Sequence, residues 1–441
     1  MMKRRYVAMI SAVLCSAMIL SACGNSKKTE SIYTGDKTEV PAWQANLDAI
    51  SPSAYADVEG LDLEPGTYIS VIGRAGGTPY WDEVKKGVEQ AAEDLNESLG
   101  YSGDDKIKVV YNAPDENDNI DEMVNILDEE LARYPDVIAV SSIDESASEV
   151  QFDLATANGI PIVAFDSGNS YQGIQCICRT DNKEAAKTGV KKLCEAIGDS
   201  GEIALLLNDS VSENGKEREA GVKEEIKANH PDVSVVETIY VDELDQLKRK
   251  AAAEQLGMSA EDLAAAEAGE KMDDAAQTTG TANGSGTDTA ETSANGDDGT
   301  ADGATAPTVA EKFEEVKSAA DKMSNEEAVA YYLKKHPELK GIFALNETST
   351  QLGIQVLDEL DNSDEIQIVG FDAGKEQVKA LEDGELDGLV VQNPFGMGYA
   401  AVIASARTVL EIGNEAEVNT GYVWVTAENM DDADIKPLVY K

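Results

Sequence analysis

The residues of this chain best suited to chemistry are polar side chains at the ends of short apolar runs. In an open α/β sheet, ligands bind beyond the carboxyl ends of the strands, so residues at these ends line the binding crevice. Carboxylates accept paired hydroxyl hydrogens, arginine donates from a planar fork, and an aromatic ring covers an apolar C–H face. Such a set fits a polyol. Its members are Arg74, Thr78, Tyr80, Trp81, Asp166, Ser167, Arg218, Asn346, Asp372 and Gln392.

A simpler explanation exists for each of these residues taken alone. Asp and Asn after a strand often cap the next helix or form a turn. The set as a whole favours a binding site, because both halves of the chain contribute to it: Asp166 comes from the first half and Asp372 from the second.

The elements that must position these side chains alternate between strand and helix from residue 68 onward. Trp81, Val84, Val88, Ala91 and Leu95 recur at spacings of three and four, which predicts an amphipathic helix. Buried apolar strands that alternate with helices indicate a parallel sheet covered on both faces. There are too many units for one such sheet. We therefore expect an α/β fold with two doubly wound parallel-sheet lobes joined by a hinge. The expected strands are 68–73, 107–111, 137–140, 161–165, 203–207, 233–241, 341–345, 366–371 and 388–391.

Composition excludes several classes of function. The 441 residues carry a net charge of −48, so binding to nucleic acid or to an anionic membrane surface is not expected. The chain has five cysteines and two histidines. Cys176 and Cys178 lack further ligands nearby and, like Cys194, read as small buried residues. We find no nucleophile–base pair and no metal constellation, so we expect no catalytic residue, no cofactor and no metal.

The N-terminus predicts export. Residues 3–5 are basic, and the apolar run 6–20 that follows is too short to span a bilayer, which disfavours an uncleaved anchor. The sequence Leu-Ser-Ala-Cys that ends at Cys23 resembles the lipobox of bacterial lipoproteins. This resemblance implies cleavage before Cys23, lipidation of its sulfur, and attachment to the cell membrane on the extracytoplasmic face.

The chain is expected to divide into a signal peptide (1–22), a tether (23–66) and two lobes. The first lobe would comprise 67–180 and 392–415, and the second 181–391 and 416–441. An acidic insertion at 251–325 interrupts the second lobe. Its centre, 273–308, has no Lys or Arg and almost no large apolar residue, so it cannot offset the entropy cost of ordering and is expected to be disordered. Its flanks, 247–268 and 309–323, are expected to be helical.

The stretches 72–81, 160–166, 217–221, 342–346 and 369–372 resemble those of the ribose/galactose-type periplasmic binding proteins, the ligand receptors of sugar ABC transporters. The resemblance spans 68–441, apart from the insertion. It implies that Tyr80 and Trp81 stack on a sugar, and that the lobes close over it. It also implies a monomer that delivers its ligand to a membrane permease. The residues implied to hydrogen-bond the sugar are Asp166, Arg218, Asn346, Asp372 and Gln392.

The chain departs from that family at several positions. Ser167 stands where ribose-type members have Arg, and Arg74 stands where they have a small polar residue. Two arginines facing Asp166 and Asp372 would keep the pocket near neutral, which favours a neutral sugar. Tyr240 is a candidate for a further ring contact. The calcium loop of some galactose-type members has no counterpart, because the span 198–202 is too short.

One alternative function stays open at this point. The same ligand-induced closure could be read by a membrane histidine kinase or a chemoreceptor instead of a permease, and the residues do not separate the two.

Overall fold

The computed structural model describes residues 40–440, apart from 145, 280–307, 362 and 434, and only the backbone of 271–279. The expected signal peptide (1–22), Cys23 and most of the centre of the insertion lie outside the described residues. Within the described part of the chain, no helix is long and apolar enough to cross a membrane.

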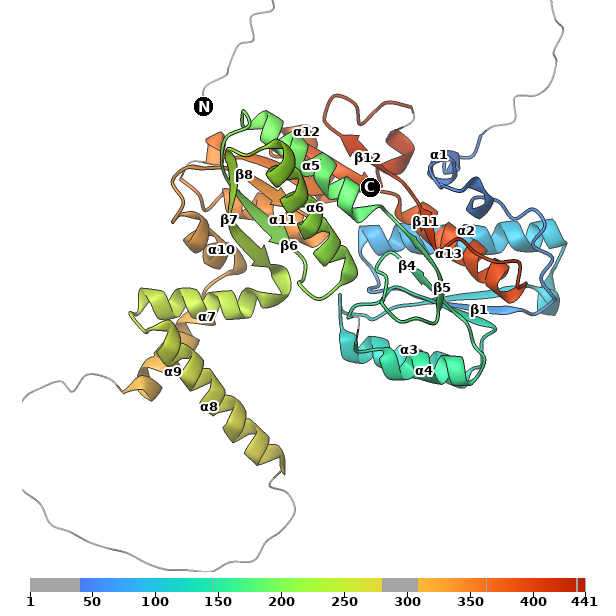
Figure 1. Cartoon of the computed structure of the whole chain (residues 1–441), viewed down its shortest axis with the longest axis horizontal. Coiled ribbons are helices and arrows are strands. Elements are labelled where there is room, and N and C mark those ends of the chain that lie inside the picture. Colours follow the sequence, from blue (N-terminus) through green and yellow to red (C-terminus); the bar gives the residue numbers. More distant parts are fainter. Residues whose placement is uncertain (1–39, 145, 280–307, 362, 434, 441) are drawn as a thin grey trace, which may run out of the picture. The chain divides into compact units, whose positions relative to one another are not determined.

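The first of two six-stranded sheets is entirely parallel, with the order β11-β5-β4-β3-β1-β2. Its neighbouring helices are α2 (Pro79–Leu99), α3 (Ile120–Ala132), α4 (Glu149–Ala157) and α13 (Pro394–Val409), as Figure 1 shows. We call this unit the first lobe. Its strands are β1 (Tyr68–Ile72), β2 (Lys108–Asn112), β3 (Val137–Val140), β4 (Ile162–Phe165), β5 (Ile174–Arg179) and β11 (Glu417–Asn419).

The second sheet has the order β12-β10-β9-β8-β6-β7, and only its edge strand β12 is antiparallel to its neighbour. Its helices are α5 (Asn182–Ala196), α6 (Glu213–Asn229), α10 (Asn325–Leu333), α11 (Glu347–Leu357) and α12 (Lys375–Asp383). We call this unit the second lobe. The expected α/β fold with two parallel-sheet lobes is confirmed. The strands are β6 (Gly201–Leu207), β7 (Val233–Tyr240), β8 (Leu339–Ala344), β9 (Gln367–Phe371), β10 (Gly388–Gln392) and β12 (Tyr422–Val425).

Each sheet buries both of its faces, with successive side chains on opposite sides. In β3, Val137 and Ala139 join the core formed with α2 and α13, whereas Ile138 and Val140 join the core formed with α3 and α4. Helices α2 and α13 approach closely because they meet at glycine: a Cβ added to Gly87 would lie 2.0 Å from the carbonyl oxygen of Phe395.

Two expected boundaries are wrong. Strand β11 pairs with β5 of the first lobe, so the first lobe extends to Asn419 and not only to residue 415. The tether does not extend to residue 66, because α1 (Gln44–Asp48) and the following residues pack on the first lobe. Tyr55, Leu61 and Leu63 are at most 4 % exposed. Pro41, Pro52 and Pro65 interrupt regular structure there, but the apolar side chains are still buried.

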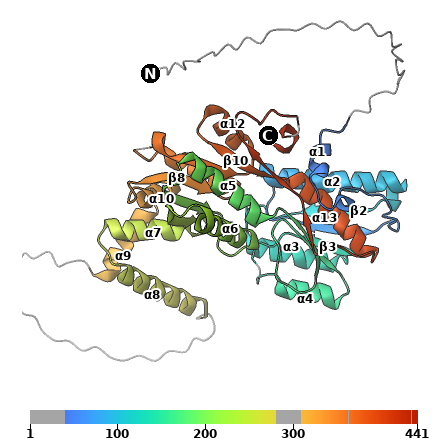
Figure 2. The ribbon, with the colours of Figure 1, turned by 45° about the horizontal axis from the view of Figure 1, so that its top comes forward.

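The flanks of the insertion are helical, as expected, but the helix of the first flank continues to Thr279, into the part (273–308) that was expected to be disordered. They comprise α7 (Leu244–Gln255), α8 (Ala260–Thr279) and α9 (Val309–Ala320), which Figure 2 shows below α10. Helices α7, α8 and α9 share a small apolar core that includes Leu263, Phe313 and Val316. Residues 280–307 of the insertion, which contain few large apolar residues, are not among the described residues.

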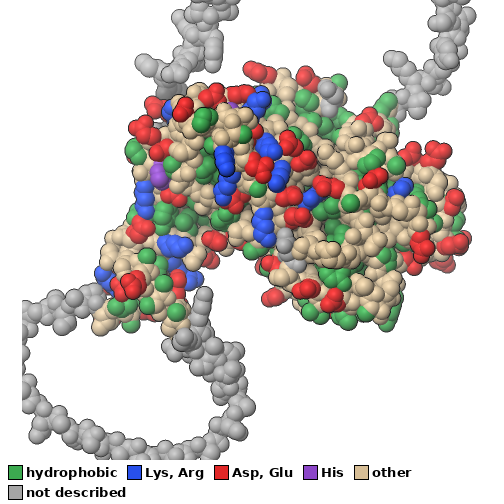
Figure 3. All heavy atoms as spheres, viewed as in Figure 1, with side chains coloured by type: hydrophobic (Ala, Val, Ile, Leu, Met, Phe, Trp, Pro, Cys, Tyr) green, Lys and Arg blue, Asp and Glu red, His purple; other side chains and the backbone are tan. Residues whose placement is uncertain are grey.

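Charge is spread over the surface. On the face shown in Figure 3, Lys and Arg side chains lie among carboxylates and form no continuous basic patch. On α5 and α6, for example, Lys187 lies between Glu184 and Glu224, with nitrogen–oxygen distances of 2.8 and 3.3 Å.

Candidate functional site

A cavity lies where the carboxyl ends of the strands of both lobes face each other. Of the eleven ligand-binding residues that the sequence predicts, nine line this cavity. The strands and the first turns of the helices that follow them bring these residues together, as the strand-end rule requires. The nine are Arg74, Thr78, Tyr80, Trp81, Asp166, Arg218, Asn346, Asp372 and Gln392.

Asp166 and Asp372 occupy matching positions in the two lobes. Each directly follows a strand, β4 or β9, and each has a left-handed backbone, with φ of 54° and 72°. This conformation is uncommon outside glycine and is concentrated at functional sites. Asp166 accepts hydrogen bonds from the Tyr80 hydroxyl at 2.6 Å and the Ser141 hydroxyl at 3.1 Å. Asp372 accepts one from the Gln392 amide at 2.8 Å.

The carboxyl group of Asp372 is buried, and burial raises its pKa above the usual range. The Arg218 guanidinium and the Gln392 amide act in the opposite direction, while Asp166 adds to the increase. Asp372 and Asp166 therefore interact electrostatically across the cavity, although they belong to different lobes.

Arg218 is held rigidly on α6 by groups of the second lobe. Its Nε donates to Asn182 at 2.9 Å, Nη1 to the carbonyl of Leu345 at 2.6 Å, and Nη2 to Gln392 at 2.8 Å. Its guanidinium also stacks on the ring of Phe371, 4.4 Å from the centroid. Because three of its five N–H groups are occupied, two stay available to a ligand.

The aromatic pair sits at the first turn of α2. Thr78 caps this helix by accepting the Trp81 N–H at 3.3 Å, and Pro79 occupies the first helical position. The rings of Tyr80 and Trp81 meet edge to face, with centroids 5.3 Å apart. Asn346 likewise caps α11 by accepting the Ser349 N–H at 2.9 Å. For Thr78 and Asn346 the simpler explanation, a helix cap, therefore holds as well.

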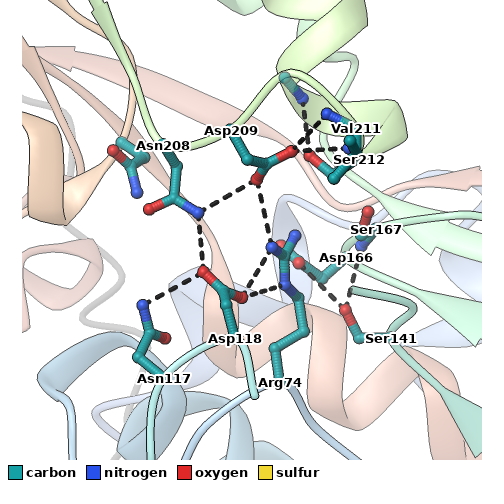
Figure 4. Close-up of polar contacts among 12 residues, drawn as sticks. Arg74, Asn117, Asp118, Ser141, Asp166, Ser167, Asn208, Asp209, Val211 and Ser212 are labelled. Carbon is teal, nitrogen blue, oxygen red and sulfur yellow. Dashed lines mark hydrogen bonds and ion pairs between the residues drawn. The ribbon is translucent and has the colours of Figure 1, made fainter. Parts of the chain in front are cut away.

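Figure 4 shows a polar cluster around Arg74 that joins the two lobes. Arg74 Nε donates to Asp118 at 2.7 Å within the first lobe, and Arg74 Nη2 reaches Asp209 of the second lobe at 3.3 Å. Asn208 of the second lobe donates to Asp118 at 2.7 Å. We call these four residues the cross-lobe cluster. Arg74 was expected to contact the ligand, but in this structure its guanidinium pairs with two carboxylates, those of Asp118 and Asp209.

The cross-lobe ion pair also affects titration. Burial alone would raise the pKa of Asp209, but the Arg74 guanidinium and the N–H of Ser212 lower it below its usual range. Asp209 accepts that N–H at 2.6 Å, which orders the start of α6.

Two predicted residues lie elsewhere. Ser167 is fully buried, and its N–H donates to the Ser141 hydroxyl at 3.2 Å. Because that hydroxyl also donates to Asp166, Ser167 helps to hold Asp166 in place and does not line the cavity. Tyr240 ends the edge strand β7 and donates to Glu219 at 3.2 Å, away from the cavity. The sequence indicates neither outcome, because both depend on the position of each strand in its sheet.

Several cavity residues escaped the sequence analysis. Asn208 and Asp209 directly follow β6, and Glu347 follows Asn346, so the strand-end rule applied consistently would have found them. Asp118 lies six residues beyond β2 and carries no such signal. The expectation of a near-neutral pocket considered two arginines and two aspartates, whereas the cavity brings five carboxyl groups together with the two arginines: Asp118, Asp166, Asp209, Glu347 and Asp372.

Both the sequence and the structure of the chain are similar to those of known proteins. Its sequence matches the periplasmic binding protein domain over residues 69–305 and 263–411. No curated protein sequence matches it significantly. Its structure is similar to a carbohydrate transporter solute-binding protein from Agrobacterium radiobacter in complex with D-arabinose. The TM-score is 0.58 and the identity 21 %, over 85 % of this chain and 98 % of the other.

Two further structures show the same fold. A solute-binding protein of an ABC transporter from Agrobacterium vitis, bound to α-D-tagatopyranose, has a TM-score of 0.60 and 19 % identity, over 85 % of this chain and 99 % of the other. A glucose-galactose binding protein from Geobacillus stearothermophilus has a TM-score of 0.58 and 18 % identity, over 83 % and 99 %. The domain match covers well over half of the sequence, and the two-lobed fold agrees with it. The chain belongs to the periplasmic binding protein family.

Proposed function

We propose that this protein is an extracytoplasmic solute-binding protein that captures a monosaccharide between its lobes and delivers it to an ABC-type permease. One observation carries the proposal: a cavity at the facing strand ends of both lobes collects planar polar groups and an aromatic pair. It encloses about 650 Å³ of space free of protein atoms, its opening to solvent included.

The chemistry of the lining supports a polyhydroxylated ligand. Asp166 and Asp372 offer acceptors from opposite lobes, Arg218 offers N–H donors, and the Trp81 ring offers an apolar face. Two proteins of similar structure were determined with bound D-arabinose and α-D-tagatopyranose. A ligand that touches both aspartates favours the closed arrangement of the lobes, because only that arrangement presents both.

Membrane attachment and delivery are further parts of the proposal. Attachment rests on the lipobox-like sequence before Cys23, which lies outside the described residues. Delivery to a permease rests on the family. No catalytic role is proposed, since the cavity residues have the roles of donors, acceptors and ring faces.

Calorimetric titration of the full mature chain tests the sugar-binding role. The panel comprises D-arabinose, D-tagatose, D-fucose, D-glucose and D-galactose. We expect at least one to bind with a Kd of about 10 μM or tighter, or roughly −7 kcal/mol. Absence of binding across the panel and its amino derivatives would contradict the proposal. For delivery, cellular uptake of the bound sugar should be lost when the gene is deleted.

A further inference from the structure

The charge of the cavity is not balanced by its own residues. Among the described residues that line it, five are carboxylic acids and two are arginines, a formal charge of −3 when all are ionised. Arg74 is engaged by Asp118 and Asp209. Arg218 donates its hydrogen bonds to the neutral oxygen atoms of Asn182, Leu345 and Gln392, and its charge partly offsets that of Asp372. Excess negative charge is therefore greatest around Asp166, Asp372 and Glu347.

Glu347 is the least compensated of these groups. The residue is 9 % exposed, and its Oε1 has no hydrogen-bond partner. It begins α11 at the cavity wall. A buried carboxylate with an unpaired oxygen is costly, so such a group either keeps its proton or meets a cation. Burial, and then the charge of Asp372, raise the pKa of Glu347 to about 8, while the Tyr80 N–H lowers it.

The groups that face Glu347 add no positive charge among the described residues. They are Asp372 after β9, Glu376 on α12, Tyr80 on α2 and Tyr440 near the C-terminus. Nor do three acidic, histidine or cysteine side chains of the described residues converge as metal ligands would. When Glu347 has lost its proton, a compensating cation would therefore have to arrive as part of the ligand.

We propose that the preferred ligand is an amino sugar, whose ammonium group lies beside Glu347 and Asp372 while its hydroxyl groups take the remaining polar partners. This inference rests on the proposed sugar-binding function and specifies its substrate class. When Glu347 is protonated, the ammonium group displaces that proton, which passes to the buffer, and a carboxylate–ammonium pair forms. A neutral sugar would release no such proton.

Calorimetry on the full mature chain tests the inference with matched probes. For the glucose and galactose series, the amine, its N-acetyl derivative and the parent sugar are titrated at pH 6.5. Two buffers of different ionisation heat count the protons released. We expect one amine to bind at least tenfold more tightly than its parent and its N-acetyl derivative, with proton release in proportion to the protonated fraction of Glu347.

The variant Glu347→Gln keeps the shape of the side chain and removes the charge. It should lose both the amine preference and the proton release, whereas Glu382→Gln, on the exposed side of α12, should retain both. A melting curve shows that each variant is folded. Binding of neutral sugars as tight as that of the amines would overturn this inference and leave the sugar-binding function intact. Failure of all sugars to bind would overturn both.

Discussion

Removing one side-chain amide of the cross-lobe cluster, that of Asn208, tests whether the cluster stabilises the closed arrangement of the lobes. Asn208 donates to Asp118 across the lobes at 2.7 Å, and it is half-buried. The variant Asn208→Ala removes this bond, together with the bond of the same amide to Asp209 within the second lobe at 3.1 Å, and leaves the ion pair between Arg74 and Asp209 in place. Because the bond to Asp118 exists only when the lobes are together, its loss destabilises the closed form relative to the open form.

The free energy lost with this hydrogen bond depends on the charge of its acceptor, the Asp118 carboxylate. A hydrogen bond to a charged group contributes about 1.5–3 kcal/mol, and the partial exposure of Asn208 places it near the lower value. A loss of about 1.5 kcal/mol lowers the closed-to-open ratio roughly tenfold. If the open form predominates without ligand, the Kd for the bound sugar weakens by about the same factor.

The same carboxylate provides a matched control. Asn117 donates to the same Oδ2 of Asp118 at 3.2 Å, but it is exposed and belongs to the same lobe as Asp118. Asn117→Ala should therefore leave closure unchanged. Small-angle scattering with and without sugar reports closure, and calorimetry reports Kd. Equal Kd values and equal scattering for Asn208→Ala and Asn117→Ala would refute the assignment of the cluster as a closing contact.

Four other results are expected. Asp372→Ala should weaken sugar binding roughly tenfold to a few hundredfold in calorimetry, because unpaired polar groups stay behind at about 1–3 kcal/mol each. Trp81→Ala should also weaken it, and an unchanged Kd in both variants would place the ligand elsewhere. The pKa of Glu347, raised to about 8, means that the folded state binds more protons than the unfolded state between about pH 4.5 and 8. Over that window the melting temperature should fall with rising pH more steeply in the wild type than in Glu347→Gln. In terms of unfolding free energy, the difference in slope is at most about 1.4 kcal/mol per pH unit. Parallel melting curves for the two proteins would contradict this. Cys23→Ser should release the protein into the medium or leave it unprocessed, and a processed, membrane-bound variant in cell fractionation would rule out the lipid anchor.

Much of the fold could be predicted because its signals are local. A short apolar run followed by an amphipathic helix is written in consecutive residues, and its repetition indicates parallel sheets. The rule that ligands meet strand ends then selected Asp166 and Asp372 without any knowledge of how the lobes face each other. Both aspartates line the cavity. The prediction failed where an element departs from the pattern, as with β11 and the apolar residues before β1.

The sequence alone therefore determined the two-lobed α/β architecture and most of the residues of the candidate site. The tertiary structure decided which of these residues are free to meet a ligand. Arg74 is engaged by Asp118, from a loop of the same lobe, and by Asp209, from the other lobe. Tyr240 lies away from the cavity because its strand is at the sheet edge. The charge of the pocket comes from groups that are distant in sequence, so a local sequence pattern cannot predict it. These groups come close enough to interact electrostatically only when the two lobes face each other in the folded protein.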